Sequence, residues 1–318
     1  MGSGGEGGRG AGAVMNAVSV PATSANLGCA FDCAALALDL HLVVEATLQA
    51  GPGLEVLCEG EGAQSIPRGP SNLVVQGVSR LAQWSGQPVP GLRLRIRSEI
   101  PVAVGLGSSA AAIVAGLLIG MQLSDTRPDQ ATLVGLASEL DGHADNVAAA
   151  YLGGMVVAAS SEGSGRVLVR KVRVPAELRF IAVVPNLPLP TAESRALLPG
   201  TYTRADAVHN LQRAALLVAS VFSGEFDLEP EFFADRWHQA QRAVAVPGLA
   251  ECLALEHPDL LGVFLSGAGS SVVGVTRGEV PEIADQLQRC FGRRGVSSRV
   301  LWLSANNRGA RVLPERTL

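Results

Sequence analysis

The chain has 318 residues, of which 47% are hydrophobic and 17% are charged. This composition is typical of a folded globular protein and excludes a disordered one. The formal net charge of −4 gives no basic field for nucleic acid or an anionic membrane, so neither partner is expected. The alternating Arg93, Arg95 and Arg97 are interpreted as one solvated strand face.

Two further properties concern the location of the protein. Five cysteines are scattered along a chain without a signal peptide, which favours a reduced, cytoplasmic protein. The most apolar run, residues 110–121, is too short to span a bilayer and is interpreted as a buried helix. The glycine-rich residues 1–14 are expected to be a disordered leader, with the folded part starting near Met15.

Strand and helix patterns mix along the chain without strict alternation, which predicts the α+β class. The expected strands, in chain order, are 17–21, 36–48, 54–60, 92–100, 155–160, 179–186, 262–276 and 298–304. The expected helices are 71–86, 108–121, 129–152, 204–224, 231–244 and 282–295, and a turn is expected at 160–166. Two domains are predicted, at 15–170 and 171–318.

A glycine–serine turn at 105–109 joins an apolar lead-in to the alanine-rich helix. Gly105 and Gly107 permit positive φ and a close approach of the backbone, and the first N–H groups of the helix have no intrahelical partner. These donors and the helix dipole make an anion site. The turn lacks the lysine of a Walker loop, and Lys171 is the only lysine in the chain. A glycine turn that merely packs the helix on a sheet is the other interpretation.

Residues 101–111, PVAVGLGSSAA, resemble the Pro-x3-Gly-Leu-Gly-Ser-Ser-Ala-Ala signature of the GHMP kinases, which phosphorylate small molecules. The resemblance implies that this segment cradles ATP phosphates. The nucleotide contacts are then Pro101, Val102, Ala103, Val104, Gly105, Leu106, Gly107, Ser108, Ser109, Ala110 and Ala111. Asn72 resembles the adenine-side asparagine of the family, and a helix cap is its other interpretation.

Residues 20–38 resemble the amino-terminal motif of the homoserine kinases, a branch of this family, and imply that Asn26 and Asp32 grip the amino acid. Segments 185–195 and 235–248 resemble the same branch. They imply that Thr191 contacts substrate and that Arg195 and Arg242 bind its α-carboxylate, for which bidentate arginine is well suited.

Residues 139–154 resemble the acidic-Gly-His-Pro-Asp-Asn block of the family, which implies substrate contacts for His143 and Asn146. Mg²⁺ prefers hard oxygen ligands, and Ser108 and Asp141 are the expected pair. Glu139 is the rival carboxylate, and Ala144 departs from the usual proline. The glycines of 264–275 resemble a third family motif, a strand-to-helix turn beside the phosphate loop that serves close packing.

The resemblance implies a ribosomal-protein-S5-domain-2-like domain followed by a ferredoxin-like domain. It also implies phosphorylation of the L-homoserine hydroxyl by ATP, on the route to threonine. With no lysine available beside an aspartate base, catalysis is expected to rest on positioning and electrostatics. Another small alcohol is an alternative substrate, although two arginines disfavour a neutral sugar. A silent paralogue is a third alternative, and a homodimer is one possible assembly.

Overall fold

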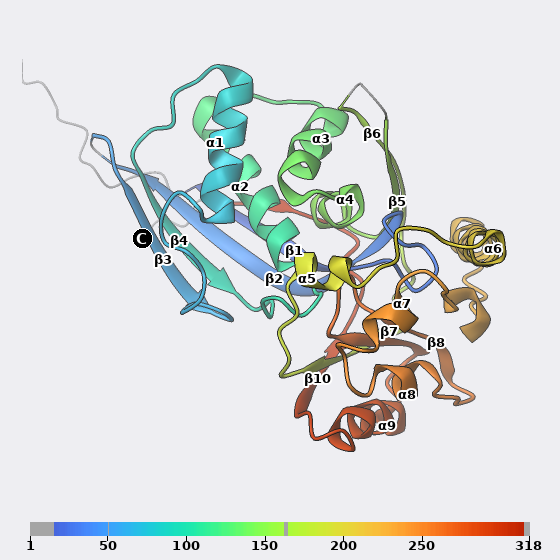
Figure 1. The fold of residues 1–318 in the computed structure, drawn as a ribbon. Helices are drawn as coiled ribbons and strands as arrows, with labels where there is room; N and C mark the ends of the chain where they lie inside the picture. Colours follow the sequence, from blue (N-terminus) through green and yellow to red (C-terminus); the bar gives the residue numbers. More distant parts are fainter. Residues whose placement is uncertain (1–15, 50, 162–164, 315–318) are drawn as a thin grey trace, which may run out of the picture.

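A computed structural model describes residues 16–49, 51–161 and 165–314 (Figure 1). The predicted leader at 1–14 and the middle of the predicted turn at 160–166 lie outside these residues. Within the same ranges no helix is long and apolar enough to cross a membrane. The helix expected at 110–121 is α2 (Ser108–Ser124), and most of its residues are buried.

The larger sheet has seven strands, and only the β3–β4 pair is parallel. Its members are β1 (Asn16–Ala25), β2 (Ala34–Leu48), β3 (Leu54–Gly60), β4 (Leu92–Ser98), β5 (Met155–Ser160), β6 (Val167–Val172) and β11 (Arg311–Leu313). β2 is long enough to pair with β5 near its start and with β4 near its end. β1 continues through a bulge at Pro21 instead of ending there.

Four helices pack on one face of this sheet (Figure 1). They are α1 (Leu73–Ser85), α2, α3 (Gln130–Asp141) and α4 (Ala144–Leu152). Glycines let α1 and α2 touch through their backbones: a Cβ on Gly116 would lie 2.1 Å from the Val74 carbonyl oxygen. The helix expected at 129–152 is two helices, because Gly142 takes a left-handed conformation that ends α3.

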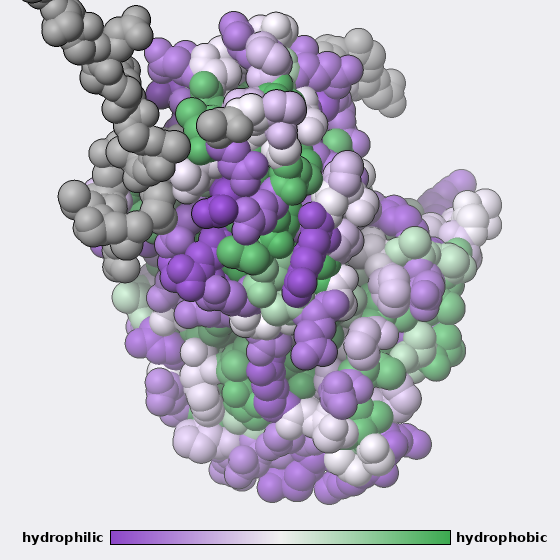
Figure 2. Space-filling model, turned by 90° about the vertical axis from the view of Figure 1, so that its left-hand side faces the viewer, coloured by the Kyte–Doolittle hydropathy of each residue, from purple (hydrophilic) through white to green (hydrophobic). Residues whose placement is uncertain are grey.

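Figure 2 views the molecule from the side of β3 and β4, where hydrophilic residues surround smaller hydrophobic areas. Each arginine of β4 forms an ion pair with a glutamate of a neighbouring strand. The pairs are Arg93–Glu55, Arg95–Glu59 and Arg97–Glu45. The interpretation of this pattern as a solvated strand face is confirmed.

The smaller sheet has four strands in the order β10-β7-β9-β8. They are β7 (Leu178–Pro185), β8 (Leu260–Leu265), β9 (Val272–Arg277) and β10 (Ser298–Leu303). The helical elements between them are α5 (Thr191–Ala196), α6 (Arg204–Phe222), the 3-10 turn η1 (Pro230–Phe233), α7 (Gln239–Arg242), α8 (Leu249–Leu253) and α9 (Pro281–Gly292). This order and connectivity are those of a ferredoxin-like unit, so the α+β class with this second fold is confirmed.

Two local expectations are wrong. The strand expected at 262–276 is the hairpin β8–β9, because positive-φ glycines at 267 and 269 turn the chain back, and no helix follows. The helix expected at 231–244 is mostly irregular. The carboxylate of Asp235 accepts bonds from the backbone N–H groups of Trp237, His238 and Gln239, and these bonds replace the helical ones.

The end of the described chain returns to the larger sheet, where β11 pairs with β1. β6 also belongs to this sheet and extends to Val172. The sheets therefore do not divide the chain at a single point, and the domain ranges 15–170 and 171–318 stay a prediction.

Candidate active site

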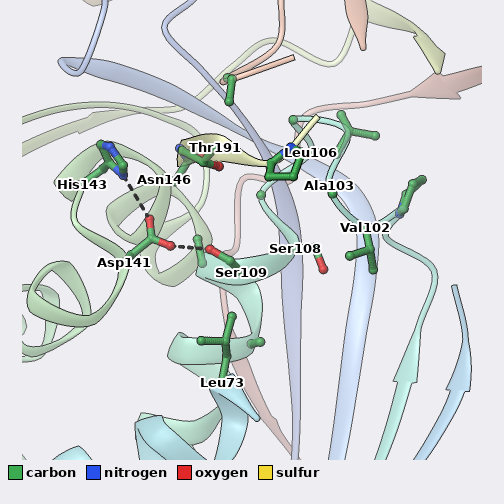
Figure 3. A pocket seen from close by; sticks show the side chains of 18 of the residues that line it. Leu73, Val102, Ala103, Leu106, Ser108, Ser109, Asp141, His143, Asn146 and Thr191 are labelled. Atoms are coloured by element: carbon green, nitrogen blue, oxygen red, sulfur yellow. Dashed lines mark hydrogen bonds and ion pairs between the residues drawn. The ribbon is translucent and has the colours of Figure 1, made fainter. Parts of the chain in front are cut away.

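A cavity of about 390 Å³ lies where the larger sheet and its helices meet the α5 and β8–β9 segments (Figure 3). Its lining combines the glycine turn before α2, the starts of α1 and α4, α5, and the loop after β1. The predicted site residues 26, 32, 72, 143, 146, 191, 195 and 242 all line it. The fold thus gathers in one cavity residues that lie far apart in the sequence.

The glycine turn is held tightly between two other segments. Gly105 and Gly107 have φ of 84° and 70°. An added Cβ on Gly105 would lie 2.1 Å from the Ser266 carbonyl oxygen, and one on Gly107 would lie 1.9 Å from Thr23 Oγ1. Ser266 Oγ also donates to the Gly105 carbonyl at 2.6 Å. The predicted close packing against the 264–275 segment is therefore present. There is no room for a side chain at position 105 or 107.

α2 begins at this turn and points its N-terminus into the cavity. Gly107 is its N-cap and provides no side-chain bond. The first intrahelical bond runs from the Ala111 N–H to the Gly107 carbonyl, so the preceding N–H groups remain for a ligand. Lys171 is elsewhere, donating to the Leu152 and Asn307 carbonyls. The positive potential at this end of the cavity comes from backbone donors and the helix dipole.

Asp141 lies beside the start of α2. Its carboxylate accepts a hydrogen bond from Ser109 Oγ, and its other oxygen is 3.9 Å from His143 Nδ1 (Figure 3). The bond to Asp141 raises the pKa of His143, and burial opposes this rise. Glu139 instead accepts two bonds from Arg80, at 2.6 and 3.0 Å. The geometry therefore favours Asp141 over Glu139 as the carboxylate of the cavity.

Figure 3 shows the hydroxyl groups of Ser108 and Ser109 pointing in different directions, with Ser109 directed to Asp141. No group of three or more acidic, histidine or cysteine residues that could hold a metal occurs in the described chain. A Mg²⁺ site with one carboxylate and a hydroxyl still fits, because this ion usually takes its other ligands from phosphates and water. The pairing of Ser108 with Asp141 stays a prediction.

The start of α4 supplies two more groups. Thr23 Oγ1 donates to Asn146 Oδ1 at 2.6 Å, which fixes that amide at the cavity wall. Ala144 is the first residue of α4, a position where proline is favoured because its missing N–H is not needed and its fixed φ suits the helix. Alanine is also a good helix former, and the helix begins at the same place without the proline of the family pattern.

Asp145 was not predicted as a site residue, although it lines the cavity. Only 2% of it is exposed, and its carboxylate accepts the Asn146 N–H at 2.7 Å. Burial raises its pKa to about 7. In the sequence it is an ordinary acidic residue of a first helical turn, and only its depth in the fold distinguishes it.

The loop after β1 carries the predicted amino-acid contacts. Asn26 is 4% exposed, donates to the Gly267 carbonyl at 2.9 Å and accepts the Asp32 N–H at 3.0 Å. Asp32 therefore sits at the mouth of the cavity on a turn that Asn26 holds. Its carboxylate oxygens lie 2.8 and 2.9 Å from Nη2 of Arg195.

Arg242 lines the same cavity as Asp32 and Arg195 and is 2% exposed. Its Nη1 donates to the Gly267 carbonyl and contacts His238 Nδ1, both at 3.0 Å. Its buried Nε has no partner among the described residues. The guanidinium groups of Arg195 and Arg242 lie 5.3 and 5.5 Å from the ring centre of Phe31. Two cations and an unused donor make this corner suitable for an anion.

Burial, followed by the charge of Arg195, lowers the pKa of Arg242 to about 10. A bound carboxylate would offset the second of these causes. The sequence analysis did not predict Phe31 as a site residue. The signal that could have found it is its position next to Asp32 in the motif at residues 20–38.

Two predicted residues have simpler surroundings. Asn72 caps α1 through its Oδ1 and donates to the Pro67 carbonyl, so both ends of its amide are used locally. Its position at the adenine stays a prediction. Thr191 begins α5 and is exposed at the cavity mouth.

The chain is similar to known proteins in sequence and in fold. Family profiles match residues 72–154 as the GHMP kinase N-terminal domain and residues 226–293 as the GHMP kinase C-terminal domain. These two matches identify the class of protein to which the fold and the cavity belong, the GHMP kinases.

Individual relatives identify the branch of the GHMP kinase family. A homoserine kinase of Solibacter usitatus is 40% identical over 92% of this chain and 95% of its own. One of Moorella thermoacetica is 38% identical over 94% and 100%. The crystal structure of homoserine kinase from Cytophaga hutchinsonii superposes with a TM-score of 0.80 at 26% identity, over 94% of this chain and 97% of that one. The chain therefore belongs to the homoserine kinase branch of the GHMP kinase family.

Proposed function

We propose that this chain transfers the γ-phosphoryl group of ATP to the side-chain hydroxyl of L-homoserine. The bond between the γ-phosphorus and the bridging oxygen breaks, a bond from phosphorus to the homoserine oxygen forms, and ADP leaves with the hydroxyl proton released. One observation carries the proposal. A helix N-terminus suited to phosphates and an arginine corner suited to a carboxylate share a single cavity.

The two ends of the cavity indicate how the substrates lie. Apolar side chains gather near α1, where Leu73, Val74 and Ile96 line the wall. An adenine base fits this end, and its phosphates then reach the N–H groups that begin α2. The γ-phosphoryl group consequently faces the amino-acid corner.

The amino acid fits the opposite corner. Arg195 and Arg242 bind the α-carboxylate, and Asp32 and Asn26 meet the ammonium and hydroxyl groups. A substrate without a carboxylate would leave the buried Arg242 without an ion-pair partner among the described residues, which disfavours a neutral sugar. His143, Asn146 and Thr191 remain proposed substrate contacts.

Mg²⁺ would be held by Asp141 and a serine hydroxyl at the start of α2, and would neutralise charge on the phosphates. The protein contributes positioning: the glycine turn fixes the phosphate oxygens, and the bond that Asn26 Oδ1 accepts from the Asp32 N–H orients Asp32. No general base is assigned, and catalysis rests on alignment and electrostatic stabilisation. A cytoplasmic location and a role on the route to threonine stay predictions.

An assay of ADP release with Mg-ATP and a panel of homoserine, mevalonate, galactose and serine tests the proposal. Turnover with homoserine alone is expected. Faster turnover with another alcohol would identify a different GHMP kinase. Binding of ATP without turnover of any acceptor would identify a silent paralogue.

A further inference from the structure

We propose that Phe31 is a positioning residue for the amino acid: its aromatic ring holds the guanidinium groups of Arg195 and Arg242 in the arrangement that binds one carboxylate. This role rests on the proposed function and assigns to it a side chain that has neither a charge nor a hydrogen-bonding group. Phe31 is half-buried and lines the cavity beside Asp32.

A tight turn fixes where the ring lies before any substrate arrives. The Cys33 N–H donates to the Ala30 carbonyl at 3.1 Å and closes the turn. Phe31 and Asp32 are consequently its two central residues. Asp32 has a φ of 53° there and donates its N–H to Asn26 Oδ1 at 3.0 Å. Adjacent positions of one turn therefore carry the carboxylate and the ring that both contact α5.

Both guanidinium groups lie over this ring, at distances suited to cation–π attraction. The Cζ atoms of Arg195 and Arg242 are 5.3 and 5.5 Å from the ring centre, within the roughly 6 Å over which such attraction is significant. The contact is worth most for a desolvated cation, and Arg242 is 2% exposed. The ring is thus a shared, uncharged partner for two like charges that otherwise repel each other.

His238 adds a third contact to the ring. Its imidazole centre is 5.2 Å from the ring centre of Phe31, and the two planes are tilted by 31°. Its Nε2 lies 2.8 Å from the Gly28 carbonyl oxygen. Because that carbonyl can only accept, Nε2 carries the proton, and Nδ1 accepts from Nη1 of Arg242 at 3.0 Å. A displaced Phe31 ring would therefore loosen the imidazole that holds Arg242.

The ring contact matters most once the amino acid is bound. The side chain of Arg195 is 42% exposed, and Asp32 is the carboxylate that pairs with it. The substrate ammonium competes for Asp32, so Arg195 loses this ion pair as it gains the α-carboxylate of the substrate. The contact with Phe31 remains through the exchange. It keeps the guanidinium near that of Arg242, where both can bind the same carboxylate.

Fluorinated phenylalanines at position 31 test this role, because each added fluorine weakens the negative face of the ring while changing its size little. With one, two and three fluorines, the KM for homoserine is expected to rise in steps, by about 3- to 30-fold in total, the range of a cation–π contact. The KM for ATP should change by less than about twofold, because backbone groups bind the phosphates. The same series at Phe291, which is buried on α9 and does not line the cavity, is the control and should leave both values unchanged.

Two ordinary substitutions separate the aromatic face from apolar bulk. Phe31→Leu keeps an apolar side chain without the face, and should raise the KM for homoserine by about tenfold without a matching loss of kcat. Phe31→Tyr keeps the face and should recover most of this loss. Thermal unfolding of each variant verifies its folding.

Arginine side-chain NMR spectra measure the contact itself without substrate. The ring current of Phe31 should displace the Nε–H resonances of Arg195 and Arg242, and Phe31→Leu should abolish the displacement. Spectra of Arg195→Gln and Arg242→Gln assign the two resonances.

Failure of this role and failure of the proposed function give different results. A wild type that does not phosphorylate homoserine contradicts the proposed function, whatever the arginine spectra show. A wild type that phosphorylates homoserine with a KM insensitive to fluorination at position 31 contradicts the role of Phe31, and so do arginine resonances unchanged by Phe31→Leu. An equal rise of the KM values for homoserine and ATP in the fluorinated series would also overturn the role, because it would reflect a general disturbance of the cavity.

Discussion

Arg195 and Asp32 hold each other across the mouth of the cavity, with Nη2 of the arginine 2.8 and 2.9 Å from the two carboxylate oxygens. One residue belongs to α5 and the other to the loop after β1, so the pair links the two parts of the fold that enclose the site. In the proposed reaction both groups face an amino acid that carries a carboxylate and an ammonium. The substrate carboxylate would then compete with Asp32 for Arg195, and the substrate ammonium would compete with Arg195 for Asp32.

Arg195→Gln is expected to raise the KM for homoserine by about 10- to 100-fold, the cost of a charge-assisted hydrogen bond. The KM for ATP should change by less than about threefold, because the phosphate end of the cavity is formed by backbone groups. Steady-state kinetics with each substrate varied in turn measure both values. Arg299→Gln is the control, since this arginine pairs with Glu61 on the surface. Equal changes in the two KM values would contradict the carboxylate assignment.

Gly107→Ala is expected to abolish measurable ATP binding, because the new Cβ would lie 1.9 Å from Thr23 Oγ1 and displace the turn. Gly142→Ala is a matched control: Gly142 also has positive φ, 83°, but nothing lies within 4 Å of its added Cβ. The control should lose only about 1–2 kcal/mol of stability from backbone strain. Isothermal titration with a non-hydrolysable ATP analogue compares them, and retained binding by Gly107→Ala would contradict the phosphate cradle.

Asp141→Asn is expected to raise the Mg²⁺ concentration for half-maximal activity by about tenfold or more, because it removes the carboxylate nearest the α2 start. Glu139→Gln should have little effect, since that side chain is engaged with Arg80. Activity is measured against free Mg²⁺ at saturating ATP. If the two variants ranked in the opposite order, the metal ligand would move to residue 139.

Asp145→Asn is expected to change how stability depends on pH. Burial raises the pKa of this carboxyl from 3.8 to about 7, so the folded state favours the proton. The wild type should therefore lose stability relative to the variant as pH rises from about 4 to 7, by about 2–4 kcal/mol. Urea unfolding of both proteins across this range gives the difference.

Asp129→Asn provides a control, because its effect on stability should depend on pH in the opposite direction. Asp129 caps α3, and its hydrogen bonds with Thr132 lower its pKa. The stabilisation by the ionised Asp129 carboxylate is fully present above its ordinary pKa near 4, and it is lost as pH falls below that value. A stability difference for Asp145→Asn that stayed constant from pH 4 to 7 would refute the raised pKa.

The glycine turn and the helix after it could be predicted because both depend on local chemistry. Positive φ at residues 105 and 107, the apolar run of α2 and its free N–H groups follow from residue types in one short segment. The solvated arginine face of β4 could be predicted for the same reason, since a strand alternates its faces, whereas its ion pairs required the pairing with β2 and β3. These features hold whatever the rest of the chain does.

Other features depend on contacts between distant segments and could not be read locally. Residues 231–244 have a helical pattern, but they are mostly irregular because the Asp235 carboxylate accepts three bonds from backbone N–H groups. The raised pKa of Asp145 and the contact of Phe31 with two arginines exist only after folding. The family resemblance located the arginines, and the structure added that Arg242 Nε has no partner in the described chain.

The pairing of β11 with β1 has a consequence during synthesis. β1 is synthesised long before residues 311–313, so its register with them is completed only after most of the described chain has been made. Until then one edge of β1 exposes unpaired backbone groups, which invite contact with other nascent chains. A chain truncated before residue 311 should keep that edge and aggregate more readily, and chaperone dependence should be greatest for such shortened forms.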